Sequence, residues 1–175
     1  LLISGVLSSQ DDCNDGYTFI DVLPETATIL SGDSCLYDLD IQALDTLRIL
    51  NELENDNHAL EVGNQTWSQG RLTGLVADYT PAGSNGVQTQ IEELPDNFGN
   101  LTKLVSLSLK SNLLEYLPDS FTNLTNLFNF TINNNWLIEL PDNFAGGEES
   151  NLYFLDLGYN QLSSLPESIC DMGSL

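Results

Sequence analysis

The pentapeptide LPDNF stands at residues 94–98 and again at 140–144, with LPDSF at 117–121 between the two copies. A fourth version, LPESI, occupies residues 165–169. The first three copies begin at 94, 117 and 140, so the interval between them is 23 residues. A period of about 20–30 residues predicts a solenoid, because one turn cannot bury its apolar face alone and must stack on its neighbours.

A second pattern, Leu-x-x-Leu-x-Leu-x-x-Asn-x-Leu, fills the space between the pentapeptides. It begins at Leu72, Leu75 and Ala77, and the segment PAGSNGVQTQ (81–90) interrupts it before Ile91 resumes it. Three complete matches at regular spacing indicate a repeat array over residues 72–175 that is incomplete at its C-terminus. The complete matches are Leu104, Leu107, Leu109, Asn112 and Leu114; Leu127, Phe130, Ile132, Asn135 and Leu137; and Leu152, Leu155, Leu157, Asn160 and Leu162.

The residue types in this pattern have physical reasons. The Leu-x-Leu alternation predicts a short strand with one buried face, and strands of successive turns would pair about 4.8 Å apart in a parallel sheet. The asparagine side chain can satisfy backbone groups that the following turn leaves unpaired, so we expect a buried ladder of Asn112, Asn135 and Asn160. Each pentapeptide proline should stop the strand and start a short helical turn. The last residue of each pentapeptide should then point into the core: Phe98, Phe121, Phe144 and Ile169.

These motifs resemble the leucine-rich-repeat family, with 23-residue units of the Leu-Pro type. The resemblance implies an α/β solenoid: a horseshoe with a parallel sheet on the concave face and short helical turns on the convex side. The segment DIQALDTLRILNELE (40–54) has apolar residues at helical spacing, and Asp38 or Asp40 could cap its first turn. With Trp67 and GRLTGL (70–75), this segment looks like the helical N-terminal cap of exported members, so we expect a cap over residues 40–71.

The N-terminal residues predict export. LLISGVLSSQ (1–10) reads as the remnant of a signal peptide, and the alternative is a mature N-terminal strand. Residues 11–39 are expected to be an irregular leader tied by a disulfide between Cys13 and Cys35, which would contribute about 3 kcal/mol in the chain-entropy model. Cys170 is left over.

The charge of the chain excludes one class of partner. There are 26 acidic and 4 basic residues, a net charge of −22, and such a field repels phosphate. We therefore expect no binding to nucleic acid. The carboxylates crowded at 11–15 and 32–40 indicate either a solvated surface or a calcium site, and the spacing of neither stretch matches a known calcium loop.

The sequence predicts a non-enzymatic protein. It has no phosphate-binding loop, no metal-ligand spacing and no nucleophile beside a base, so we expect no catalytic residue, no metal and no cofactor. The single histidine, His58, lies in a polar loop and is interpreted as solvated. No apolar run is long enough to span a membrane.

The resemblance implies recognition of a protein or other extracellular ligand, basic or neutral in charge, by a secreted or cell-surface protein. The alternative is a structural surface or fibre component assembled through repeat stacking. Recognition would use the variable strand positions of the concave face, where exposed aromatic residues are typical of interface anchors. The expected partner-binding residues are Val105, Lys110, Phe128, Asn129, Thr131, Tyr153, Phe154, Asp156 and Tyr159.

Overall fold

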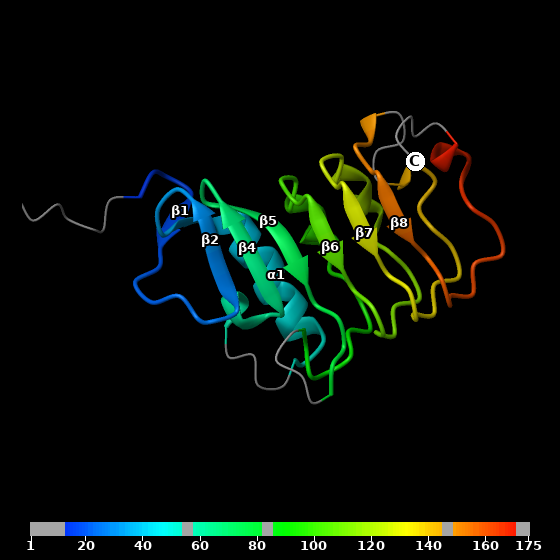
Figure 1. Ribbon diagram of the computed structural model, residues 1–175, viewed down its shortest axis with the longest axis horizontal. Helices are drawn as coiled ribbons and strands as arrows, with labels where there is room; N and C mark the ends of the chain where they lie inside the picture. The colour runs from blue at the N-terminus through cyan, green and yellow to red at the C-terminus, as the bar shows by residue number, and fades with distance from the viewer. Residues whose placement is uncertain (1–12, 54–57, 82–85, 145–148, 171–175) are drawn as a thin grey trace, which may run out of the picture.

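The computed structural model describes residues 13–53, 58–81, 86–144 and 149–170. Its main element is a six-stranded sheet in the order β2-β4-β5-β6-β7-β8, whose strands lie side by side along the long axis of the molecule (Figure 1). The expected signal-peptide remnant at 1–10 lies outside the described residues. The strands are β2 (Ala27–Ser31), β4 (Asn64–Ser68), β5 (Arg71–Val76), β6 (Ser106–Ser108), β7 (Asn129–Thr131) and β8 (Phe154–Asp156).

The strands of the repeats are parallel and in register. Leu75 of β5 is the partner of Leu107 in β6, which is followed by Phe130 in β7 and Leu155 in β8. The first three of these side chains are buried, because the alternation of the strand turns them toward the core of the solenoid. The prediction of a solenoid with a parallel sheet is confirmed.

The side of the solenoid away from the sheet consists of short 3₁₀ helices. They are η2 (Asp96–Asn100), η3 (Asp119–Asn123) and η5 (Glu167–Ile169), and each follows a proline in extended conformation. The phenylalanines of the pentapeptides are fully buried and stack on one another. The ring centroids of Phe98 and Phe121 are 6.4 Å apart, and those of Phe121 and Phe144 are 5.7 Å apart. The pentapeptide therefore recurs because every turn needs the same corner and the same core ring.

The single α-helix of the described residues, α1 (Asp38–Leu50), begins two residues before the expected range and ends four residues before its end. Ala43, Leu44 and Leu47 are buried, whereas Leu50 is exposed. The expected side-chain cap is wrong: Tyr37 is the N-cap residue and makes no capping bond through its side chain. No described helix is both long and apolar enough to cross a membrane.

The expectation of an irregular segment over 11–39 is also wrong for the residues that the structure describes. β1 (Tyr17–Phe19) pairs antiparallel with β3 (Cys35–Tyr37), while β2 joins the main sheet beside β4. Cys13 and Cys35 form a disulfide, and their Cα atoms are 5.6 Å apart. Cys170 is a free, exposed thiol.

Candidate functional site

The outward residues of the repeat strands form one surface, which we call the open sheet face. Leu107 of β6 and Phe130 of β7 are buried and Leu155 of β8 is partly buried, so the residues on either side of them face away from the core. The open sheet face is made by Val105, Ser106, Ser108, Lys110, Phe128, Asn129, Thr131, Tyr153, Phe154, Asp156 and Tyr159.

Three residues of this face occupy the same position in successive turns. The backbone N–H of Phe128 donates to the carbonyl of Val105 at 2.8 Å, and that of Tyr153 donates to Phe128 at 2.9 Å. The rings of Phe128 and Tyr153 stack, with centroids 5.1 Å apart and an interplanar angle of 8°. Their side chains are nevertheless 42% and 63% exposed, so the pair is ordered without being covered.

Two further aromatic residues of this face lie on β8 and beyond its end. Phe154 follows Tyr153 directly, pairs in register with Asn129 and is half exposed. Tyr159 lies beyond the end of β8, is largely exposed, and has a positive φ of 56°. We call Phe128, Tyr153 and Phe154 the aromatic group of the open sheet face; Tyr159 lies beyond the end of β8.

Lys110 already has a partner within the chain, so its charge is not free on the open sheet face. Its Nζ lies 3.7 Å from Oδ2 of Asp78. The other oxygen of Asp78 accepts hydrogen bonds from the backbone N–H of Lys110 at 2.8 Å and from the hydroxyl of Ser108 at 2.6 Å. Asp156 has a local role, since its Oδ1 accepts from the N–H of Gly158 at 3.0 Å.

Asparagine side chains join each turn to the one before it. Oδ1 of Asn135 accepts from the N–H of Leu114 at 3.0 Å, and its Nδ2 donates to the carbonyls of Leu109 at 2.9 Å and Ile132 at 3.0 Å. Asn112 and Asn160 make the corresponding three bonds in their own turns. Asn112 and Asn135 are buried, whereas Asn160 is half-buried in the last described turn.

This ladder, repeated with the Leu-Pro corner on a parallel sheet, is the arrangement that the leucine-rich-repeat resemblance implies. The chain has a leucine-rich-repeat fold. Structural comparison finds a leucine-rich-repeat protein of Leptospira interrogans with a TM-score of 0.46 and 38% sequence identity, covering 50% of this chain and 22% of that one. It also finds an internalin from Listeria monocytogenes with a TM-score of 0.40 and 24% identity, covering 50% of this chain and 25% of that one.

The matched part of the chain thus spans a quarter or less of the length of each of these two proteins. No protein-family model matches the chain, and no curated protein matches it.

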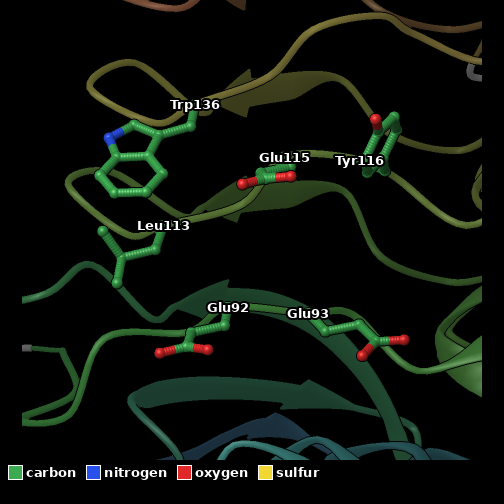
Figure 2. A pocket seen from close by; sticks show the side chains of 6 residues that line it. All are labelled: Glu92, Glu93, Leu113, Glu115, Tyr116 and Trp136. Atoms are coloured by element: carbon green, nitrogen blue, oxygen red, sulfur yellow. The ribbon is translucent and has the colours of Figure 1, made fainter.

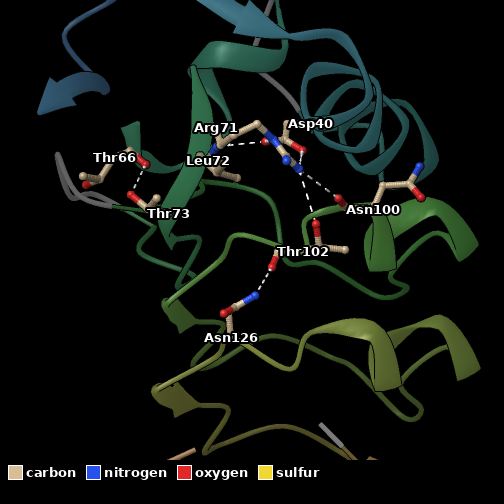
Figure 3. Close-up of polar contacts among 8 residues, drawn as sticks. All are labelled: Asp40, Thr66, Arg71, Leu72, Thr73, Asn100, Thr102 and Asn126. Atoms are coloured by element: carbon tan, nitrogen blue, oxygen red, sulfur yellow. Dashed lines mark hydrogen bonds and ion pairs between the residues drawn. The ribbon is translucent and has the colours of Figure 1, made fainter. Parts of the chain in front are cut away.

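A buried ion pair that the sequence analysis missed joins α1 to the first repeat strand of the leucine-rich repeats (Figure 3). The guanidinium of Arg71 donates to both oxygens of Asp40 at 2.9 Å, and its charge also lies 4.2 Å from the centroid of the Tyr37 ring. Burial acts to lower the pKa of Arg71, but the hydrogen bonds and charge of Asp40 outweigh it and raise this pKa above its ordinary value. Asp40 is expected from the sequence to cap α1. In the structure its side chain is buried and accepts the hydrogen bonds of Arg71 instead.

Two carboxylates of the acidic clusters considered as a calcium site accept hydrogen bonds from neighbouring residues of the described chain. Oδ1 of Asp33 accepts from the N–H of Cys35 at 3.0 Å, and Asp38 accepts from the hydroxyl of Thr18 at 2.7 Å. Among the described residues no group of three or more His, Cys, Asp or Glu is placed to hold a metal ion. His58 is exposed, and its Nδ1 accepts from the N–H of Leu60 at 3.1 Å.

Proposed function

We propose that the chain is a non-enzymatic recognition module that binds another protein through the open sheet face, which would be the concave face of the horseshoe. The observation that carries this proposal is the exposed stack of Phe128 on Tyr153. Large rings that are ordered before binding lose little side-chain freedom when a partner covers them, and they bury much apolar area. Phe154 extends the same group on the neighbouring position of β8.

The composition around the rings supports recognition over simple strand pairing. Cross-strand aromatic pairs do stabilise sheets, and the Phe128–Tyr153 pair would contribute this whether or not a partner binds. The flanking positions, however, carry Ser106, Asn129 and Thr131, whose short polar side chains can donate and accept hydrogen bonds at an interface rim. An apolar centre with a polar rim is the usual arrangement of a protein interface.

The charge of the chain restricts the partner. With a net charge of −22, association with another acidic protein would be opposed by long-range repulsion, so a basic or neutral partner is proposed. Because Lys110 is already paired with Asp78, it would contribute to recognition only by exchanging that carboxylate for one on the partner.

The residues before β5 are proposed to act as one N-terminal cap for the repeats. β2 and β4 extend the repeat sheet, and α1 lies against η2, the corner of the first turn. Nδ2 of Asn97 donates to the hydroxyl of Thr46 at 3.1 Å, which ties η2 to α1. The cap would thus unite the disulfide-tied leader at 11–39 with the segment at 40–71, ahead of repeats over 72–175.

A secreted or cell-surface location is proposed on two grounds. Disulfides persist in oxidising compartments, and Cys13 and Cys35 are joined. The apolar start of the sequence has the composition of a signal-peptide end.

The test is capture of partners by the chain and by the double variant Phe128→Ser/Tyr153→Ser, followed by titration of one purified partner. A matched control is Leu30→Ser/Ile49→Ser, which removes two exposed apolar side chains outside the open sheet face. We expect the Phe128/Tyr153 variant to weaken binding at least about tenfold, the effect of losing a hot spot, while its melting temperature falls only slightly, because the lost cross-strand pair is worth at most about 1 kcal/mol. Equal affinity of both variants and the parent chain would reject the open sheet face as the binding surface.

A further inference from the structure

A pocket of about 540 Å³ lies beside the sheet, where three successive turns leave their strands (Figure 2). In Figure 2 the carboxylate of Glu115 lies between the rings of Trp136 and Tyr116, with Glu92 and Glu93 on the adjacent turn. We call this hollow the edge pocket. It is lined by Glu92, Glu93, Leu113, Glu115, Tyr116 and Trp136.

Backbone hydrogen bonds between turns hold these residues in fixed rows. The N–H of Leu113 donates to the carbonyl of Ile91 at 2.9 Å, and the N–H of Trp136 donates to Leu114 at 3.0 Å. This register places Trp136 one turn beyond Leu113, and Glu115 one turn beyond Glu92. The pocket is therefore built from equivalent positions of neighbouring repeats.

The first row is also anchored to α1. Oδ1 of Asn51 accepts from the N–H groups of Glu92 and Glu93 at 2.8 and 3.0 Å, while its Nδ2 donates to the carbonyl of Glu93 at 2.8 Å. These three bonds fix the backbone that carries both carboxylates. The side chains can therefore face a ligand without any rearrangement of the main chain.

The edge pocket has negative charge without a counter-ion in the described part of the chain. No ion pair reaches Glu92, Glu93 or Glu115 there: Arg48, Arg71 and Lys110 are held by other carboxylates, and Lys103 forms no ion pair with a described residue. The rings beside these acids are open to solvent, with Trp136 50% and Tyr116 53% exposed. An exposed indole next to unpaired carboxylates can bind a cation through both the ring and the carboxylates.

The same chemistry occurs, already satisfied, elsewhere in this chain. Arg71 lies with its guanidinium carbon 4.2 Å from the centroid of the Tyr37 ring while it donates to both oxygens of Asp40. The edge pocket offers the equivalent aromatic ring and carboxylates, but supplies no arginine of its own.

We infer that the edge pocket binds an arginine side chain from a basic segment of a partner protein. The guanidinium would stack on the indole of Trp136 and donate hydrogen bonds to the carboxylates of Glu115 and Glu92. Arginine fits better than lysine because its planar group can stack and donate to two carboxylates at once, and because it is more weakly hydrated. The acidic field of the chain would favour the approach of such a segment.

The experiment titrates the full 175-residue chain with the tripeptide acetyl-Gly-Arg-Gly-amide at low ionic strength, followed by tryptophan emission and calorimetry. Trp136 is exposed and Trp67 is fully buried, so a change in emission reports on the edge pocket. We expect saturable binding, weaker binding of the lysine tripeptide, and none of the tripeptide with citrulline, which lacks the charge. Absence of saturation, or equal binding of the citrulline peptide, would overturn the inference.

Variants separate the pocket from the general acidity of the chain. Glu115→Gln and Trp136→Leu should each weaken the arginine tripeptide about three- to tenfold by calorimetry, as expected for an exposed charge pair and an exposed cation–π contact. Glu167→Gln is the matched control, since it removes one exposed carboxylate in η5, and it should change affinity little.

Equal weakening by Glu167→Gln and Glu115→Gln would mean diffuse attraction only and would overturn the inference. Millimolar calcium at constant ionic strength provides a further check. If calcium displaced the arginine tripeptide completely, and Trp136→Leu bound the tripeptide as tightly as the parent chain, the site would be a metal-binding carboxylate cluster instead. Circular dichroism of each variant checks folding. Phe128→Ser/Tyr153→Ser should bind the tripeptide like the parent chain, which makes the edge pocket independent of the open sheet face.

Discussion

Asp40 of α1 and Arg71 of β5 form a two-point ion pair with both N···O distances at 2.9 Å. The Asp40 side chain is completely buried, and it also accepts from the backbone N–H of Leu72 at 2.9 Å. Arg71 in turn approaches the carbonyl of Asn100 and the hydroxyl of Thr102 at 3.5 Å each, where η2 ends and the chain enters the second turn (Figure 3). One carboxylate therefore holds α1, the first repeat strand and, through Arg71, the segment that leads from the first turn into the second.

Removing the carboxylate of Asp40 should lower the free energy of unfolding. Asp40→Ala would leave the charge of Arg71 without its partner in a mostly buried site, and we expect a loss of about 3 kcal/mol in the free energy of unfolding. Asp45→Ala is the control on the same helix, because the Asp45–Arg48 pair is more exposed than Asp40–Arg71 and should be worth less than about 1 kcal/mol. Urea denaturation of the two variants measures both values, and a similar loss for both would contradict the structural role of Asp40.

The pH dependence of the same pair follows from the raised pKa of Arg71. A cation whose pKa is raised on folding contributes stability that is fully present below its unfolded pKa and is lost only as the pH rises through its folded pKa. Because an arginine in the unfolded chain is already protonated well above neutral pH, the contribution should stay intact up to strongly alkaline pH. The difference in stability between the parent chain and Asp40→Ala should therefore be constant from about pH 7 to 10, and a steady decline over this range would disagree with the assignment.

The asparagine ladder can be tested at its central rung. Asn135→Ala removes one acceptor and one amide donor group, leaving the N–H of Leu114 and the carbonyls of Leu109 and Ile132 buried without these bonds. We expect a loss of about 1–3 kcal/mol. Asn143→Ala changes the same side chain at an exposed position and should have little effect on the melting temperature. Equal effects of the two changes would mean that the ladder does not stabilise the stack.

Tyr159 occupies a backbone conformation that suits a smaller residue. Ser111 and Asn134 hold the corresponding place in the preceding turns, with φ of 59° and 56°, and Tyr159 has φ of 56°. Asparagine tolerates this left-handed region better than tyrosine, so Tyr159→Asn should stabilise the fold by about 0.5–1 kcal/mol. Tyr153→Asn, at an exposed tyrosine without positive φ, should give no gain. A lower melting temperature for Tyr159→Asn would show that the ring makes stabilising contacts.

The cysteines predict a simple labelling pattern. Iodoacetamide should modify one thiol per chain, Cys170, under native non-reducing conditions, because Cys13 and Cys35 are joined. After reduction in denaturant, intact mass spectrometry should show three labels. Three labels before reduction, or a peptide linking Cys170 to Cys35, would contradict the pairing.

The repeats could be predicted from the sequence because their information is local and recurs. Asparagine at the turn and phenylalanine at the end of the pentapeptide each have one physical role, and the structure places Asn135 and Phe121 in those roles. The N-terminal strands were missed because they are short and pair over long distances. β2, for example, binds β4 with Ala27 opposite Gln65, and no periodicity marks either strand.

The two candidate sites also differ in whether the sequence could predict them. Phe128 and Tyr153 could be placed side by side because the repeat fixes the register of their strands. The edge pocket could not be found in this way, since Glu92, Glu115 and Trp136 come from three turns and only the inter-turn hydrogen bonds bring them together. Asp40 was misassigned because an aspartate at a helix start has a common local role, whereas its partner Arg71 is 31 residues away.

The direction of the asparagine bonds bears on how such an array can change in length. Asn135 satisfies a donor and an acceptor of the preceding turn, and Asn160 does the same for the turn that contains Asn135. Each repeat unit thus brings the groups that complete its predecessor and leaves the same requirement for its successor. Duplication or deletion of a whole unit within the DNA would preserve every one of these pairings. Repeat number in a protein of this kind can therefore drift by unequal recombination without any compensating mutation inside the remaining units.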